Sequence, residues 1–100
     1  MKKEQLQIEL NTLLAEASKL ERQAIVENET ITFLGDEADK ILIKSQDESL
    51  SLEERELICK QMATLLRRIQ IENDFLAKDM KQLSDLSEKL NYYSTLIIEE

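Results

Sequence analysis

The chain has 100 residues and a net charge of −8; 34% of its residues are charged, 42% are apolar, and it contains one Gly and no Pro. This composition excludes a turn-rich β fold and indicates long helices, and a chain of this length forms a single domain, residues 1–100. Charges of both signs are interspersed, which argues against binding to nucleic acid or to an anionic membrane surface.

Targeting and cofactor signals are absent from the sequence. No apolar run approaches the roughly 18 residues that a membrane-spanning helix needs, and the first residues, Met1 to Leu6, lack the apolar core of a secretory signal. We therefore expect an intracellular protein, cytoplasmic or nuclear. With one Cys and no His, we expect no transition-metal site and no cofactor.

The first apolar segment, residues 2–44, carries a heptad pattern. Apolar residues recur in alternating steps of four and three, with Leu6 at position d and Leu10 at position a. Only Glu27 interrupts this series. The pattern predicts a helix whose inward stripe is Leu6, Leu10, Leu13, Ala17, Leu20, Ala24, Glu27, Ile31, Leu34, Ala38 and Ile41.

Within this segment, residues 27–36 form the weakest helical stretch. Thr30, Thr32 and Phe33 have modest helix propensity, and Gly35 costs about 1 kcal/mol relative to Ala in a helix interior. Gly35 is either a tolerated exposed glycine, a kink, or a point of close approach by a partner chain. A corner in this stretch would give a three-helix bundle, which we keep as an alternative.

Residues 45–51, here called the elbow, separate the two apolar segments. Ser45 and Glu48 are polar at positions where the stripe would continue, and Ser51 with Glu54 three residues later forms a capping box. Ser49 is an alternative N-cap. One unbroken helix would preserve the phase of the heptads across the elbow, but the capping signals favour a chain that folds back on itself.

The second apolar segment, residues 52–98, resumes the same phase. Its g positions add Ile58, Leu65, Leu86 and Tyr93, so its apolar face has the width of a bundle helix. Its predicted a and d residues are Leu52, Arg55, Cys59, Met62, Leu66, Ile69, Asn73, Leu76, Met80, Leu83, Ser87, Leu90, Ser94 and Ile97.

Two of these positions carry specific expectations. Cys59, at a, is expected to be a small buried hydrophobe. Asn73, also at a, either fixes register and oligomeric state from a buried position or faces solvent.

The sequence offers no catalytic constellation. The chain has no His, and its carboxylates fall mostly at outward heptad positions, where solvated charge belongs. Asp36, Glu37 and Asp39 do not have the spacing of a calcium loop. We expect no catalytic, cofactor or metal residues, no small-molecule substrate and no enzymatic activity.

Apolar residues outside the heptad stripe, together with the apolar C-terminal stretch from Leu90 to Ile98, predict contact with other chains. Tyr is favoured at interfaces because it combines apolar area with a polar tip. The candidate interface residues are Ile25, Val26, Phe33, Leu66, Ile69, Asn73, Tyr92, Tyr93 and Ile97.

The residues around the elbow, Lys40–Ser49 followed by Leu52–Glu54, resemble a stretch of centromere protein H, a coiled-coil subunit of the inner kinetochore, and Lys19–Gln23 adds to this resemblance. It covers about a third of the chain and implies a scaffold role in a multi-subunit complex at the centromere. Separately, Lys89–Tyr93 is similar to helical subunits of Golgi tethering complexes. Neither resemblance transfers a functional residue.

Together these patterns predict an all-α fold, a long antiparallel helical hairpin of the coiled-coil type that assembles into a helical bundle. The predicted function is a non-catalytic scaffold or assembly subunit whose partners are protein helices, either in a homo-oligomer or in a hetero-complex. The alternatives are a small helical adaptor or regulatory module that binds a peptide or helix, or a tethering-complex subunit.

Overall fold

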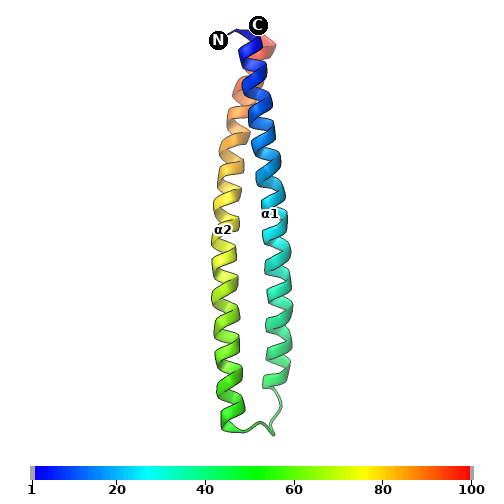
Figure 1. The fold of residues 1–100 in the computed structure, drawn as a ribbon, viewed down its shortest axis with the longest axis vertical. Coiled ribbons are helices and arrows are strands. Elements are labelled where there is room, and N and C mark those ends of the chain that lie inside the picture. The colour runs from blue at the N-terminus through cyan, green and yellow to red at the C-terminus, as the bar shows by residue number, and fades with distance from the viewer. Residues whose placement is uncertain (1, 100) are drawn as a thin grey trace. The chain divides into compact units, whose positions relative to one another are not determined.

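The computed structural model describes residues 2–99 and contains two α-helices within them (Figure 1). Helix α1 spans Lys3–Ser45 and has 43 residues, and helix α2 spans Leu52–Glu99 and has 48. The helices are joined by the elbow, and no strand is present in the described part of the chain. The all-α helical hairpin is therefore confirmed, and one unbroken helix through the elbow is wrong.

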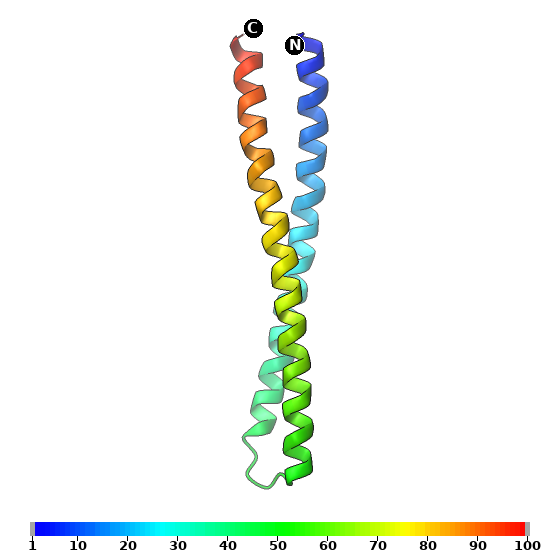
Figure 2. The ribbon, with the colours of Figure 1, turned by 90° about the vertical axis from the view of Figure 1, so that its left-hand side faces the viewer.

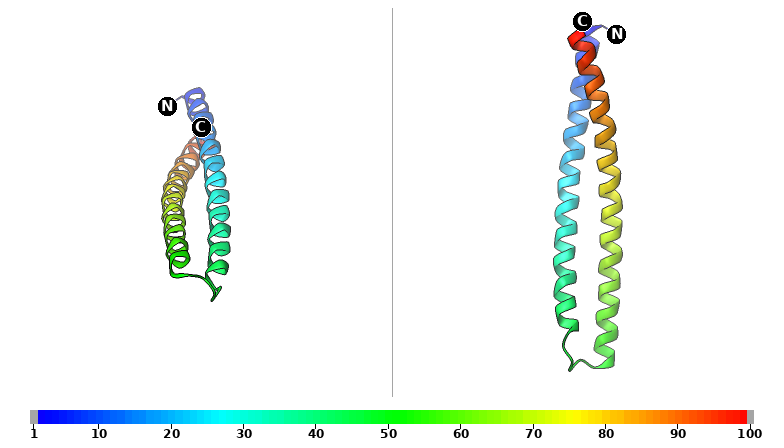
Figure 3. Two further views of the ribbon diagram at one scale, coloured as in Figure 1. Left: turned by 60° about the horizontal axis from the view of Figure 1, so that its bottom comes forward. Right: turned by 180° about the vertical axis from the view of Figure 1, so that it is seen from behind.

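Contacts divide the hairpin into two compact units. In the terminal unit, the part of α1 up to Val26 packs antiparallel to the part of α2 from Leu76 onward, with both chain ends at the same end of the unit (Figures 2 and 3). In the turn unit, Glu27–Phe75, the second half of α1 leads into the elbow and the first half of α2 returns beside it.

The elbow is closed by the capping interactions that its sequence predicts. The Ser51 hydroxyl accepts a hydrogen bond from the Glu54 amide at 3.2 Å and donates one to the Glu54 carboxylate at 3.1 Å. Ser51 is thus the N-cap of α2, satisfying one of the amides that a helix start leaves without a helical partner. Ser49 instead donates its amide and its hydroxyl to the Asp47 carboxylate, at 2.9 and 2.7 Å.

The hydrogen bonds of Arg55 explain why a charged residue occupies this position of the heptad pattern. Its guanidinium reaches back from the first turn of α2 and donates to the backbone carbonyls of Leu50, Asp47 and Glu48 at 3.4 to 3.5 Å. The side chain stabilises the elbow, so a charged residue is accommodated at this predicted d position.

The stretch from residue 27 to 36 is helical throughout, so a third helix with a corner there is wrong. The Thr32 hydroxyl donates to the Asn28 carbonyl at 3.0 Å, within the helix. A Cβ added at Gly35 would have no heavy atom within 4 Å. No close packing inside the chain therefore requires a glycine at this position.

The inward stripe of α1 follows the predicted a and d positions. Leu6, Leu13, Ala24 and Leu34 are buried, and the intervening stripe residues, including Glu27, are half-buried. This regular covering matches the 3.5-residue repeat on which the prediction rested.

The inward stripe of α2 is shifted by one heptad position from the prediction. Most covered residues recur at d and g instead of a and d: they are Ile58, Met62, Leu65, Ile69, Glu72, Leu76, Asp79, Leu83, Leu86, Leu90, Tyr93 and Ile97. Near the end of α2, Ser94 at a and Leu96 at c are also half-buried. The predicted a residues Cys59, Leu66, Asn73, Met80 and Ser87 are exposed, and so is Leu52 at 74%. The predicted burial of Cys59 is therefore wrong, and Asn73 faces solvent.

The shift has a simple energetic cause. Covering Ile58 in place of Cys59, or Leu86 in place of Ser87, removes more apolar area from water, at about 25 cal/mol per Å². The g positions Glu72 and Asp79 lower this gain, and both side chains are only half-buried.

Candidate interaction surface

Few side chains are buried in either unit. The terminal unit buries Leu6, Leu13, Ala24 and Leu86, and within the turn unit only Leu34 is buried among the described residues. Two paired helices have too little interior to bury many side chains, and small cores give marginal stability. A large share of the apolar side chains of the described residues therefore remains exposed.

This exposed apolar surface is extensive. Among the described residues, fifteen large apolar side chains have roughly half or more of their area accessible. Scattered surface hydrophobes of an ordinary monomer would be fewer. The fifteen are Ile8, Leu14, Ile25, Val26, Phe33, Leu42, Ile43, Leu52, Leu57, Leu66, Ile71, Phe75, Met80, Tyr92 and Ile98.

The structure places the nine predicted interface residues in two groups. Six are exposed: Ile25, Val26, Phe33, Leu66, Asn73 and Tyr92. Ile69, Tyr93 and Ile97 are half-buried on the inward stripe of α2, so most of their area is used within the chain. The predicted interface did not contain four other exposed residues, Leu42, Leu57, Ile71 and Phe75. Each is a large apolar residue outside the a, d and g positions, and that pattern could have identified them from sequence.

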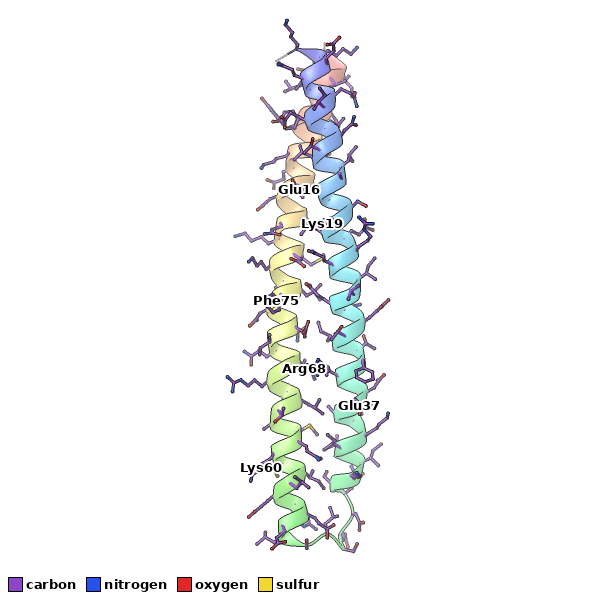
Figure 4. All side chains as sticks on the ribbon, in the orientation of Figure 1. Glu16, Lys19, Glu37, Lys60, Arg68 and Phe75 are labelled. Carbon is purple, nitrogen blue, oxygen red and sulfur yellow. The ribbon has the colours of Figure 1, made fainter. Side chains whose placement is uncertain are left out.

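One flank of the turn unit carries a groove whose lining mixes charged, polar and apolar side chains. It is lined by Glu37 and Ile41 from α1 and by Lys60, Gln61, Thr64 and Leu65 from α2. Figure 4 labels Glu37 and Lys60, which lie on different helices of this flank. Glu37 also accepts a hydrogen bond from Lys40 at 3.1 Å, an exposed ion pair worth little to stability.

The opposite flank of the turn unit carries few charged residues. Glu37, at position g, lies on the groove side of the covered stripe of α1, so the e residues Gly35 and Leu42 lie on the other side. On α2, Gln61 borders the groove, so the a residues flank the stripe on the side away from it. We call this surface the neutral face and define it as Gly35, Leu42, Cys59, Ala63 and Leu66.

The side chains of the neutral face are accessible. Leu42 is 52% exposed and Leu66 is 54% exposed, Cys59 and Ala63 are exposed, and Gly35 is half-buried with open space at its Cβ position. Small residues beside large ones form the kind of knob-and-hole surface into which a further helix packs.

The terminal unit has a separate aromatic feature. The Tyr92 and Tyr93 rings make an edge-to-face contact, with centroids 5.7 Å apart and planes at 64°. They line a groove together with Glu9, Leu13, Asp85, Glu88 and Lys89. Tyr92 remains 63% exposed, so this groove presents an aromatic ring among charges of both signs.

The described residues include no group of three or more Cys, Asp or Glu side chains placed to hold a metal ion. Among these residues, no helix carries an apolar stretch long enough to cross a bilayer. Asp36, Glu37 and Asp39 lie on the surface of α1, with Glu37 engaged by Lys40.

Comparison of the sequence with family models and with curated proteins, and of the fold with solved structures, returned no match.

Proposed function

We propose that this chain is a non-catalytic assembly subunit that associates, through its exposed apolar surfaces, with helices of other protein chains. One observation carries the proposal: among the described residues, five form the buried core while fifteen large apolar side chains stay exposed. Each Leu moved from water into an interface contributes about 1.5–3 kcal/mol, so association would provide the burial that the two helices lack.

The same surface supports a helical partner over an extended peptide. The exposed apolar residues lie on helices and follow heptad spacing, as at positions 52, 59, 66 and 80, and a partner helix matches such a surface by knobs-into-holes packing. The resemblance of the elbow region to centromere protein H supports, as a more specific form of the proposal, a kinetochore-like scaffold in the nucleus or cytoplasm.

The first test measures the stability of the isolated chain. Helicity and urea unfolding are followed by circular dichroism at protein concentrations from 1 to 100 µM, a range chosen because an association-coupled fold has a concentration-dependent midpoint. We expect the midpoint to rise with concentration. A strictly concentration-independent midpoint with stability above about 5 kcal/mol, that of an ordinary domain, would contradict the proposal.

The second test uses capture from source cells, comparing the wild-type chain with two variants. Tyr92→Glu places a charge on an exposed apolar position, and Asn11→Glu places the same charge on an exposed polar one. Loss of helical partner proteins with the first variant only is the expected result. Equal capture by all three chains would remove the tyrosine surface from the proposal.

A further inference from the structure

The groove of the terminal unit that the two tyrosines line is acidic on both of its sides. Glu9 lies on the α1 side, and Asp85 and Glu88 lie on the α2 side. Among the described residues that line it, three carboxylates thus stand against a single ammonium, that of Lys89. We call this surface the tyrosine groove and define it as Glu9, Leu13, Asp85, Glu88, Lys89, Tyr92 and Tyr93.

The three carboxylates of the tyrosine groove have no partner within the described chain. Each side chain is exposed, and none of them forms an ion pair, not even Asp85 with Lys89 four residues later. Asp85 and Glu88 are three residues apart on one helix, a spacing at which like charges repel each other. A cation supplied by another chain would replace this repulsion with attraction.

The tyrosines add an aromatic face to the acidic groove. Their rings meet edge to face, with centroids 5.7 Å apart, and Tyr92 is 63% exposed. A cation placed over such a ring is attracted by the negative charge of its π face. The buried Leu13 gives the groove an apolar floor, and the hydrocarbon stem of a long cationic side chain packs along surfaces of this kind.

These features favour arginine over other cationic side chains. A guanidinium is planar, so it stacks on an aromatic ring and pairs with a carboxylate through two parallel hydrogen bonds. The ammonium of lysine is more strongly hydrated and acts as a point charge. The net charge of −8 acts in the same direction, because it attracts a basic chain and repels an acidic one, including a second copy.

We propose that the tyrosine groove binds an arginine-bearing helix of a basic partner protein. One guanidinium stacks on Tyr92, and arginines three and four residues apart on the partner, which share one helix face, pair with Glu9, Asp85 and Glu88. This inference rests on the proposed assembly function and states the partner chemistry for one of its surfaces.

The test measures the binding of a fluorescent helical peptide to the full chain by fluorescence anisotropy in about 50 mM NaCl, where surface charges are weakly screened. The peptide consists of alanine with arginines in alternating steps of three and four residues. One comparison peptide has citrulline, which keeps the shape of arginine without its charge, and another has lysine. We expect the arginine peptide to bind, the lysine peptide to bind more weakly, and the citrulline peptide not to bind.

Two double variants remove the same charge at the same spacing. Asp85→Asn with Glu88→Gln neutralises the groove. The control, Asp36→Asn with Asp39→Asn, neutralises two exposed carboxylates of the turn unit that are also three residues apart. We expect the groove variant to weaken binding of the arginine peptide roughly fivefold, the size expected for two exposed ion pairs. The control should change binding by less than about twofold, because its charges act only at long range.

Two substitutions at Tyr92 separate the aromatic face from apolar area. Tyr92→Phe keeps the ring face, and Tyr92→Leu keeps apolar area without a ring. We expect binding to weaken roughly two- to fivefold with leucine and to stay nearly unchanged with phenylalanine. All substituted side chains are exposed, so helicity measured by circular dichroism should remain, and it is checked for each variant.

Four results overturn the inference. They are an arginine peptide that does not bind, citrulline or lysine peptides that bind as tightly as arginine, equal losses in the two double variants, and full binding by Tyr92→Leu. Equal losses would mean that the peptide follows the overall charge of the chain instead of occupying the groove. The assembly function is decided separately, by the concentration dependence of the unfolding midpoint, and it stands if only the groove fails.

Discussion

Gly35 is a position at which the isolated chain and an assembly would favour different residues. It lies within α1, where glycine loses more backbone entropy on folding than alanine does, and its Cβ position is open. Its conformation does not require a glycine, because no described residue has a positive φ.

Gly35→Ala is therefore expected to stabilise the isolated chain by about 1 kcal/mol, the difference in helix propensity. The measurement is urea unfolding at the lowest protein concentration at which the chain is folded. The control is Ala15→Gly at an exposed position of the same helix, which should lower stability by a similar amount. Destabilisation by Gly35→Ala would reveal a contact at this position that the single chain does not contain.

Asp47 is the residue whose ionisation is linked to the elbow. Hydrogen bonds from the Ser49 hydroxyl and amide, with a smaller contribution from the Arg55 charge, hold the pKa of the Asp47 carboxyl below its ordinary value of 3.8. A carboxyl with a lowered folded-state pKa favours the folded elbow above its ordinary pKa. This contribution is lost as the pH falls from about that value through the folded-state pKa.

The elbow is therefore expected to loosen only in the acid range below the ordinary pKa, observed by NMR as a titration of the Asp47 carboxyl and the Ser49 amide. Ser49→Ala removes the hydroxyl donor and keeps the amide, so the pKa of Asp47 should rise partway toward its ordinary value. Asp47→Asn should abolish the acid transition at the Ser49 amide. An Asp47 pKa that is unchanged in Ser49→Ala would show that the hydroxyl contact is absent in solution.

At the level of a single helix, the apolar face of α2 is three heptad positions wide, and this width allows two ways of packing against α1. Apolar residues occupy a, d and g, so either the a/d pair or the d/g pair can face α1. The structure covers d and g, leaving Met80 at a 53% exposed and Leu86 at g 7% exposed.

Leu86→Ala is accordingly expected to cost about 2–5 kcal/mol of unfolding free energy, the range for truncating a buried leucine. Met80→Ala should cost well under half of the Leu86→Ala value, because a half-exposed side chain leaves no cavity. Both are measured by urea unfolding of the terminal unit within the full chain. If the order of the two effects were reversed, the a/d stripe predicted from sequence would be the buried one.

Much of the fold was predictable from sequence, and the exception has a physical cause. The polar elbow and the Ser51–Glu54 capping box are local signals, and α2 begins at the predicted residue while α1 ends one residue beyond its predicted end. The face of α2 was not predictable from the heptad phase, because it depends on comparing total apolar area at a and at g. Cys59 and Ser87 on one side, against Ile58 and Leu86 on the other, decide that comparison.

The candidate surface was only partly predictable for the same reason. Tyr92, Phe33, Ile25 and Val26 were recognisable because they are apolar outside the stripe. The neutral face was not predictable. The heptad phase places Leu66 in the inward stripe, and Leu42 and Gly35 can be assigned to one flank only when the position of the groove is known.

For the whole molecule, net charge governs how association depends on salt. The chain carries −8, and the carboxylates of the tyrosine groove are the proposed partners of arginines on a basic helix. The dominant effect of salt is then to weaken this attraction, since the screening length falls from about 10 Å at 0.1 M to about 3 Å at 1 M.

We therefore expect binding of the arginine peptide to weaken severalfold between 50 mM and 500 mM NaCl, conditions chosen to span that screening range, as measured by fluorescence anisotropy at neutral pH. NaCl is preferred to sulfate, which also strengthens apolar burial. Tighter binding at high salt would mean that apolar contacts hold the peptide, and the contact would then lie away from the acidic groove.

The shifted stripe of α2 has a mechanical consequence. Neighbouring heptad positions are about 50° apart around a helix axis, since seven residues make two turns. A rotation of α2 about its own axis by that angle would exchange Ile58, Leu65 and Leu86 for Cys59, Leu66 and Ser87 on the inside, and every backbone hydrogen bond would be kept. Rolling would thus exchange the g residues of α2 for its a residues on the inside without unfolding the helix.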